Sequence, residues 1–217
     1  MAAEPKFADN VFFVPDDQRV ACNWGGYSIV EGTLNAMRFA LHGTDRFFHY
    51  VIDISGAHYP IKSNAEIRAY LAQAPHKIYM QSQNQAIHAP LPEMWNYHIE
   101  CDDAVHRIGR LVEPRGIEMF MGSQWFSVPR HFAHWLLWDD LPTKYSHYAR
   151  HVVVADENFF ATMARNSPFC GDIVTKNGVY LHFDRWENLK AEEFARDVDR
   201  RKCLSRDPTH CGRSPTT

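Results

Sequence analysis

Apolar residues recur along the chain with two spacings, and each spacing predicts a different kind of element. Between Ile29 and Leu41 they recur every three or four residues, which predicts a helix that follows Trp24-Gly25-Gly26 and ends at Gly43. Shorter apolar runs predict strands. These runs are residues 11–14, 47–54, 77–80, 95–100 and 117–121. We expect 47–54 to be a buried strand.

Two further helices are marked by residues that favour a helix start. Ser63 and Glu66 have the spacing of a capping box, in which each side chain bonds the backbone of the other residue. They predict a helix through Leu71. Pro129 suits the first turn of a helix through Leu136, because proline lacks the N–H group that this position leaves unbonded.

Asp156 and Glu157 stand between the valines at 152–154, which we interpret as the end of a strand, and a helical pattern through Ala164. The first turn of a helix stabilises an anion through its unbonded N–H groups and the helix dipole. A carboxylate at such a junction is well placed to take a proton from a bound hydroxyl. In the alternative interpretation, Asp156 only caps the helix and Glu157 is a solvated acid.

The clearest local pattern is a β-hairpin near the C-terminus. Two apolar runs, 173–175 and 179–183, flank Asn177-Gly178, a dipeptide typical of two-residue hairpin turns. Strands alternate with helices over most of the remaining length. We therefore predict an α/β fold with a mixed sheet flanked by helices.

Composition and charge narrow the class of protein. The 217 residues carry a net charge of −3, so no basic surplus is available for nucleic acid, and we expect no nucleic-acid partner. Apolar residues make up 45% and charged residues 23%, as in globular domains. No apolar run approaches the ~20 residues of a membrane span, and the first residues do not resemble a signal peptide.

The five cysteines leave at least one unpaired. Cys203 and Cys211 flank a short polar stretch and could close a small disulfide loop; the alternative is five reduced thiols. The sequence contains no Cys-x-x-Cys pair, so neither a zinc ribbon nor a thioredoxin-type site is expected.

Metal and phosphate motifs are weak or missing. His131/His134 and His147/His151 have helical spacing but lack the Glu of a zinc-binding helix motif, so we interpret them as surface or partly buried histidines. Asp197-Val198-Asp199 lies in a charged, helix-like run and is interpreted as a solvated face. The glycine-rich dinucleotide and P-loop patterns and the serine nucleophile motif do not occur. We expect no metal and no cofactor.

Six segments, taken together in this order, carry a resemblance. They are Trp24-Gly-Gly-Tyr-Ser28, Ile54-Ser-Gly-Ala-His-Tyr-Pro-Ile-Lys-Ser-Asn64, Gly122-Ser-Gln-Trp-Phe126, Asp156-Glu-Asn-Phe-Phe-Ala-Thr162, Asn166-Ser-Pro-Phe-Cys170 and Cys211-Gly-Arg-Ser-Pro215. The set resembles the Core-2/I-branching family of glycosyltransferases. It is most similar to the protein xylosyltransferase branch, with segments of the types W-G-G, L-S-G-x-D-Y-P-I, G-S-D-W-F, E-S-F-F-x-T and C-G-x-S-P.

The resemblance implies a GT-A-type fold and a one-step, inverting transfer of a sugar from a UDP donor to a hydroxyl of a protein or glycan. The family works without an Asp-x-Asp metal site. Its general base is the Glu that corresponds to Glu157. The residues 8–217 would be a partial catalytic domain without the family's first strand region and its closing C-terminal segment. Family members are usually Golgi membrane proteins with the catalytic domain on the lumenal side.

The family's donor contacts correspond to Trp24, Trp125, Arg213 and Ser214. The two tryptophans would wall the sugar-nucleotide site. Ser214 and Arg213 would lie near the diphosphate, where positive charge balances the leaving UDP. Arg213 corresponds to a basic residue of the branching N-acetylglucosaminyltransferases and not of the xylosyltransferases.

Two positions depart from the xylosyltransferase pattern: Gln124 replaces the Asp of G-S-D-W-F, and His58 replaces the Asp of L-S-G-x-D-Y-P-I. Xylose is the favoured sugar. A branching β-1,6-N-acetylglucosaminyltransferase is the alternative, supported by Asp156-Glu157 and Arg213. A third alternative is a truncated module that binds a glycan or a partner without turnover.

Overall fold

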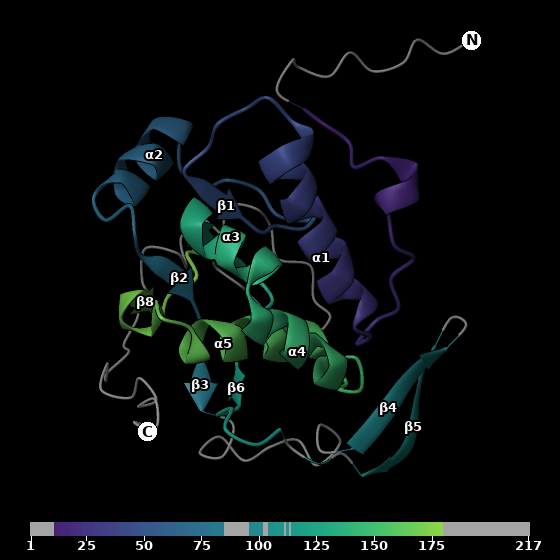
Figure 1. The fold of residues 1–217 in the computed structure, drawn as a ribbon. Coiled ribbons are helices and arrows are strands. Elements are labelled where there is room, and N and C mark those ends of the chain that lie inside the picture. Colours follow the sequence, from purple (N-terminus) through teal and green to yellow (C-terminus); the bar gives the residue numbers. More distant parts are fainter. Residues whose placement is uncertain (1–10, 85–95, 102–103, 111, 113, 180–217) are drawn as a thin grey trace, which may run out of the picture.

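The computed structural model describes residues 11–84, 96–101, 104–110, 112 and 114–179 (Figure 1). Its largest sheet has four strands in the order β1-β7-β2-β8. They are β1 (Tyr50–Ile52), β7 (Phe126–Pro129), β2 (Ile78–Met80) and β8 (Ile173–Val174). β7 is antiparallel to β1 and β2, whereas β8 is parallel to β2. The predicted mixed α/β fold is therefore confirmed.

The described helices surround this sheet (Figure 1). They are α1 (Ser28–Arg38), α2 (Asn64–Ala72), α3 (Arg130–Trp138), α4 (Asp140–Ala149) and α5 (Ala155–Asn166). A π-helical turn, Phe39–Gly43, extends α1, and short 3-10 turns lie at Asp16–Gln18 and Cys170–Asp172.

Helix α5 lies at the centre of the described fold. It contacts α1, α4 and the short strand β6 (Phe120–Met121), and Phe159, Phe160 and Met163 are almost fully buried along it. A helix that is apolar on more than one face belongs in a core. The Thr162 hydroxyl bonds both the N–H and the carbonyl oxygen of Phe120, at 3.0 Å each, and so fixes β6 beside the helix.

Two small sheets complete the described fold. β3 (Gln83–Asn84) pairs with β6, and β4 (Asn96–Cys101) pairs with β5 (Ala104–Arg110), both antiparallel. In Figure 1 the β4–β5 ladder reaches away from the helices. It is attached to the turn after α4, where the His98 N–H donates to the His151 carbonyl oxygen at 3.1 Å and the Tyr97 ring stacks on the His151 ring.

Local signals predicted several elements correctly. The helix after Trp24-Gly25-Gly26 is α1, and both bonds of the Ser63–Glu66 capping box are present at the start of α2. Strands β2, β4 and β6 fall within the apolar runs at 77–80, 95–100 and 117–121 to within one residue. Pro129 lies immediately before α3, as its N-cap.

Other predictions were wrong. Residues 11–14 form no strand, and Val11 and Phe13 are exposed. The run 47–54 contributes only β1, an edge strand that pairs with β7 alone and whose Ile52 is exposed. The valines at 152–154 form a turn after α4, not a strand, so Asp156 and Glu157 lie at a helix-turn-helix junction.

The hairpin predicted at 173–183 stays a prediction, because the structure describes only its first strand. Residues 173–174 form β8, which pairs with β2, and residues 180–183 lie outside the described part of the chain. Gly178 has a φ of 72°, and the Asn177 side-chain oxygen accepts from the Val179 N–H at 3.2 Å, so a turn is present there.

No helix in the described residues is long and apolar enough to cross a membrane. Cys22 and Cys101 form no disulfide. Cys203 and Cys211, for which a disulfide loop was considered, lie outside the described residues.

Candidate functional site

The candidate site is the N-terminus of α5, and it begins with an unusual backbone. Val154, the N-cap residue, has φ 55° and ψ 47°, in the left-handed region. That conformation costs a residue with a Cβ about 1–2 kcal/mol. The Val154 N–H donates to the Gly25 carbonyl oxygen at 2.8 Å, and Gly25 itself has a φ of 76°. The Trp24-Gly25-Gly26 loop is thereby joined to the turn before Glu157.

A second segment is joined to the same helical turn by Gly122. Its N–H donates to the carbonyl oxygen of Glu157 at 2.8 Å. A Cβ on Gly122 would lie 1.8 Å from the carbonyl oxygen of Gln81, so the close approach of the two backbones requires glycine. The Gly122–Phe126 segment therefore lies beside Glu157 for a steric reason.

Trp125 brings in a third segment. Its ring meets the His58 ring at a centroid distance of 4.5 Å and an interplanar angle of 65°. Ser55 fixes both the side chain and the backbone of His58. The backbone N–H of Ser55 donates to His58 Nδ1 at 3.0 Å, and the backbone N–H of His58 donates to the Ser55 carbonyl oxygen at 3.1 Å. The loop that follows β1 is thus held against the loop that precedes β7.

Asp53 lies where these loops meet. Its N–H donates to the Phe126 carbonyl oxygen at 2.9 Å, and its Oδ2 is buried without a hydrogen-bond partner among the described residues. Burial, together with the nearby carboxylate of Asp156, raises the pKa of Asp53 to about 7. A carboxyl group with such a pKa is partly protonated at neutral pH.

Asp156 is more deeply buried, at 6% exposed, and its Oδ1 also has no partner among the described residues. Burial raises its pKa, although the N–H groups of Asp156 and Glu157 offset part of this effect. These are N–H groups of the first turn of α5, so a capping role of Asp156 remains an alternative to a role in the site.

Glu157 is half-buried. Burial raises the pKa of its carboxyl group, and the neighbouring Asp156 raises it further. The helix N-terminus favours the ionised form, but these two effects exceed it. A carboxylate with a raised pKa is a stronger base, which suits proton abstraction from a hydroxyl.

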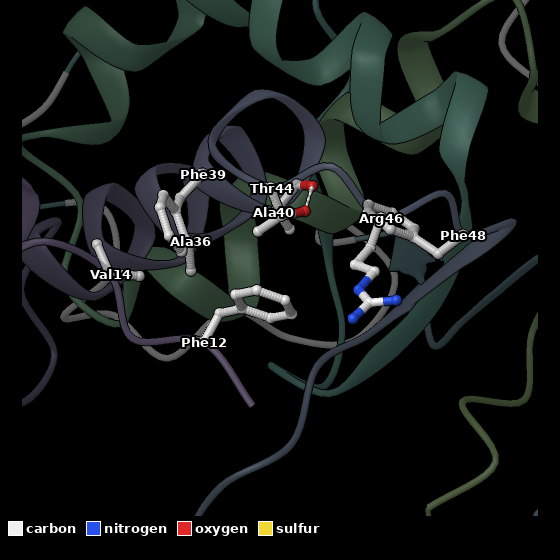
Figure 2. Close-up of a pocket in the computed structure, with 8 residues that line it drawn as sticks. All are labelled: Phe12, Val14, Ala36, Phe39, Ala40, Thr44, Arg46 and Phe48. Atoms are coloured by element: carbon white, nitrogen blue, oxygen red, sulfur yellow. Dashed lines mark hydrogen bonds between the residues drawn. The ribbon is translucent and has the colours of Figure 1, made fainter. Parts of the chain in front are cut away.

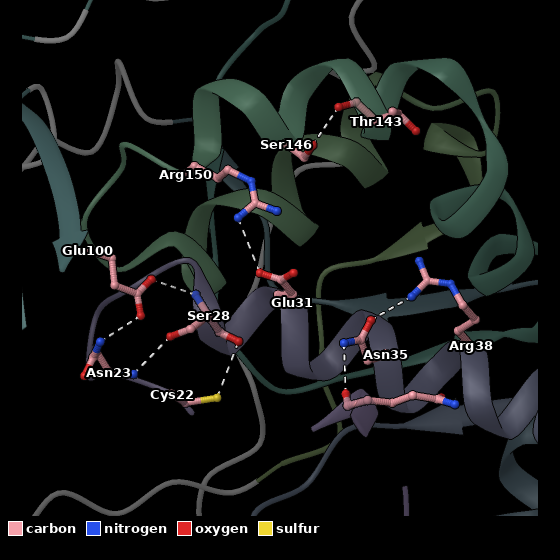
Figure 3. Close-up of polar contacts among 11 residues, drawn as sticks. Cys22, Asn23, Ser28, Glu31, Asn35, Arg38, Glu100, Thr143, Ser146 and Arg150 are labelled. Atoms are coloured by element: carbon pink, nitrogen blue, oxygen red, sulfur yellow. Dashed lines mark hydrogen bonds and ion pairs between the residues drawn. The ribbon is translucent and has the colours of Figure 1, made fainter. Parts of the chain in front are cut away.

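Glu100 bonds the residues on both flanks of the Trp24-Gly25-Gly26 loop (Figure 3). Its carboxylate accepts from the Ser28 N–H and from Asn23 Nδ2, both at 3.0 Å, at the start of α1. Burial acts to raise the pKa of Glu100, but these hydrogen bonds outweigh it and the pKa is lowered. A Cβ on Gly26 would lie 2.5 Å from the Glu100 carboxyl carbon, so this glycine leaves room for the carboxylate.

A separate open hollow of about 780 Å³ lies along the second half of α1 (Figure 2). It is lined by Phe12, Val14, Ala36, Phe39, Ala40, Thr44, Arg46 and Phe48. None of these residues belongs to the six segments that carry the family resemblance, so the hollow is not part of the candidate site.

The model of the family "Core-2/I-Branching enzyme" matches residues 3–210. The chain belongs to this family. Xylosyltransferase 1 of Rattus norvegicus is 32% identical over 172 residues, which are 77% of this chain and 21% of that protein.

Two further relatives are also xylosyltransferases. Xylosyltransferase 1 of Homo sapiens is 32% identical over 77% of this chain and 18% of its own length. Xylosyltransferase 2 of Rattus norvegicus is 28% identical over 85% of this chain and 22% of its own length. The chain spans about a fifth of the length of the relatives it matches.

The structure brings together some of the site residues expected for a Core-2/I-branching enzyme. Trp24 is 85% exposed and adjoins Gly25, which bonds Val154, while Trp125 is partly buried and follows the segment that bonds Glu157. Arg213 and Ser214 lie outside the described residues, as do Asp197 and Asp199. The described residues contain no group of three or more His, Cys, Asp or Glu placed to hold a metal ion.

Sequence reasoning missed two contributors. Asp53 was read only as part of a strand, because nothing local distinguishes an acid that a distant segment buries. His58 was noted as a departure from the family pattern, but its contact with Trp125 is visible only in the fold. The one sequence signal for Asp53 was its position as a charged residue near the end of the apolar run 47–54.

Proposed function

We propose that this chain is part of an inverting glycosyltransferase that transfers xylose from UDP-xylose to a hydroxyl group of a protein or glycan. Glu157 is the general base. Membership in the Core-2/I-branching family and the likeness to two kinds of xylosyltransferase support the reaction class and the sugar. By the same family likeness, the enzyme acts in the Golgi lumen.

One observation carries the proposal. Two segments that are far apart in the sequence, Trp24–Gly26 and 122–126, bond the backbone at the start of α5, where Glu157 lies, and the loop after β1 contacts 122–126. Backbone hydrogen bonds and a ring contact join them. A base needs to lie within hydrogen-bond reach of the proton it abstracts, in a site walled for the substrate. Glu157 lies in the first turn of α5, and the segments joined there carry Trp24 and Trp125, which supports the roles proposed for these three residues.

The proposed mechanism gives each of these residues a role. The Glu157 carboxylate accepts the proton of the acceptor hydroxyl as its oxygen attacks the anomeric carbon of the sugar. The bond from that carbon to the UDP oxygen breaks on the opposite face, which inverts the configuration. Trp24 and Trp125 wall the donor, Arg213 balances the charge of the departing diphosphate, and Ser214 lies near it. The reaction uses no metal ion.

The alternative donor is UDP-N-acetylglucosamine, as for a branching enzyme. Asp156-Glu157 and Arg213 favour it. A third possibility, a binding module without turnover, would apply if the chain bound donor but transferred nothing.

The test is a UDP-release assay on the 217-residue chain, run with EDTA and with a panel of UDP-sugars and hydroxyl acceptors. We expect UDP-xylose to give the highest acceptor-dependent rate. A higher rate with UDP-N-acetylglucosamine would replace xylose by the branching-enzyme donor. Donor binding without release would support the non-catalytic module, and a rate abolished by EDTA would contradict the metal-independent mechanism.

A further inference from the structure

The hydrogen bonds around His58 fix the position of its proton. Nδ1 accepts from the N–H of Ser55 at 3.0 Å, and a backbone N–H can only donate. The neutral imidazole carries one proton, so it must be on Nε2. The Ser55 hydroxyl also lies 2.7 Å from Nδ1 and adds a second donor on the same side.

The Nε2–H of His58 is a buried donor without an acceptor among the described residues. Leaving a buried polar group unpaired costs about 1–3 kcal/mol. Two other buried polar atoms in the same site share this condition, Asp53 Oδ2 and Asp156 Oδ1. Asp156 is 6% exposed, so its free oxygen faces the interior of the site and not bulk water.

Two of these groups lie next to the Trp125 segment, and the third acts electrostatically on one of them. His58 contacts the indole ring, and Asp53 is bonded through its N–H to Phe126, the next residue. Asp156 acts electrostatically on Asp53 and adjoins Glu157. Trp125 is only partly buried. A ligand ring can therefore pack on the exposed part of its indole, with polar groups beside it.

The chemistry of the three groups selects the ligand. Carboxyl groups repel a diphosphate, so the negative part of a nucleotide sugar is excluded from this place. A sugar hydroxyl both donates and accepts, and it can bond a carboxylate and an imidazole N–H at the same time. The apolar face of a pyranose ring suits an indole.

We propose that His58, through Nε2–H, donates a hydrogen bond to a ring hydroxyl of the transferred sugar and so helps to determine which sugar the enzyme accepts. Asp53 and Asp156 accept from hydroxyls of the same sugar. This inference rests on the proposed function, because it places the sugar of the UDP donor beside Glu157. The xylosyltransferase-type segment has Asp in place of His58, so this chain presents a donor where that pattern presents an acceptor.

The test uses calorimetric titration of the 217-residue chain with UDP, with UDP-xylose and with each analogue of UDP-xylose that lacks one ring hydroxyl. The key variant is His58→Asn, whose amide oxygen can still accept from Ser55 N–H while the donor at the Nε2 position is lost. We expect the wild-type chain to bind one deoxy analogue about 3- to 10-fold more weakly than UDP-xylose. In His58→Asn this ratio falls to about one.

Two further variants separate this role from folding. His58→Gln places an amide N–H near the Nε2 position and should keep most of the discrimination. His134→Ala is the matched control, because His134 also packs on a tryptophan, Trp138, with a centroid distance of 4.5 Å, but on α3 and exposed. It should leave every ratio unchanged. Circular dichroism establishes that each variant is folded.

The outcomes distinguish the two proposals. If His58→Asn binds UDP normally and keeps the wild-type discrimination against every deoxy analogue, the role of His58 is refuted and the proposed function stands. Equal binding of all analogues by the wild-type chain would refute it in the same way. If the folded wild-type chain binds neither UDP nor UDP-xylose, the proposed function fails, and the role of His58 fails with it.

Discussion

Asp53 shows how a single side chain makes the stability of this fold depend on pH. Its pKa is about 7 in the folded chain and 3.8 in its ordinary environment, so the folded state binds the proton more tightly than the unfolded state. The stabilisation is complete below pH 3.8 and is lost as the pH rises through 7. Asp156, whose pKa is also raised, acts in the same direction.

We therefore predict that the free energy of unfolding falls between pH 4.5 and pH 7.5, and that it falls less in Asp53→Asn. The amide cannot ionise, so the variant does not acquire the buried charge. The difference between the two proteins should be at least about 1 kcal/mol, since one pKa unit corresponds to about 1.4 kcal/mol. Urea unfolding at the two pH values measures it. Asp17→Asn, at an exposed position, is the control. The prediction would be contradicted if the free energy of unfolding of Asp53→Asn fell as much between the two pH values as that of the wild type.

Asp156 makes a second prediction at the residue scale, for catalysis. Its negative charge raises the pKa of Glu157, so Asp156→Asn should lower that pKa. A base is active when ionised. The rise of kcat/KM with pH on the acidic side of its pH profile should therefore occur at lower pH in the variant. Transfer rates measured from pH 4.5 to 8 test this. Asp140→Asn, an exposed acid in the first turn of α4, should leave the profile in place, and a limb that moved to higher pH would exclude the proposed repulsion.

At the scale of elements, the turn between α4 and α5 shows why part of the fold was predictable and part was not. The Ser63–Glu66 capping box is a local pattern, so the sequence alone located the start of α2. Val154 carries no such signal, because a β-branched residue disfavours the left-handed conformation. In the fold, the N–H of Val154 bonds the carbonyl oxygen of Gly25, and this contact between distant residues cannot be recognised from the local sequence. Three valines therefore resembled a strand and formed a turn.

The strain at Val154 predicts the effect of a substitution. Asparagine adopts the left-handed conformation more readily than valine, so Val154→Asn should raise the free energy of unfolding by about 1 kcal/mol. Urea denaturation at pH 6 measures this. Val112→Asn, at a position that is 83% exposed and has no positive φ, should be neutral. A loss of stability in Val154→Asn would mean that packing of the valine side chain outweighs the strain.

At the scale of the whole molecule, the candidate site depends on contacts between distant segments. The family segments could be recognised from the sequence, and so could Glu157, Trp24 and Trp125 as candidates. The orientation of these segments could not be predicted, because it depends on the fit of Gly122 against Gln81 and on the hold of Glu100 on the start of α1. The burial of Asp53 could not be predicted either, because it depends on its contacts with Phe126 of β7 and Asp156 of α5.

The central claim is that Glu157 acts as the base of a glycosyl transfer. The most direct measurement is the acceptor-dependent rate of UDP release from UDP-xylose by the wild-type chain and by Glu157→Gln, with Glu31→Gln on α1 as the matched control. We predict a loss of about 10²–10⁴-fold for Glu157→Gln, with donor binding retained, and no more than a two-fold change for the control. A folded Glu157→Gln variant that transfers xylose at the wild-type rate would contradict the account.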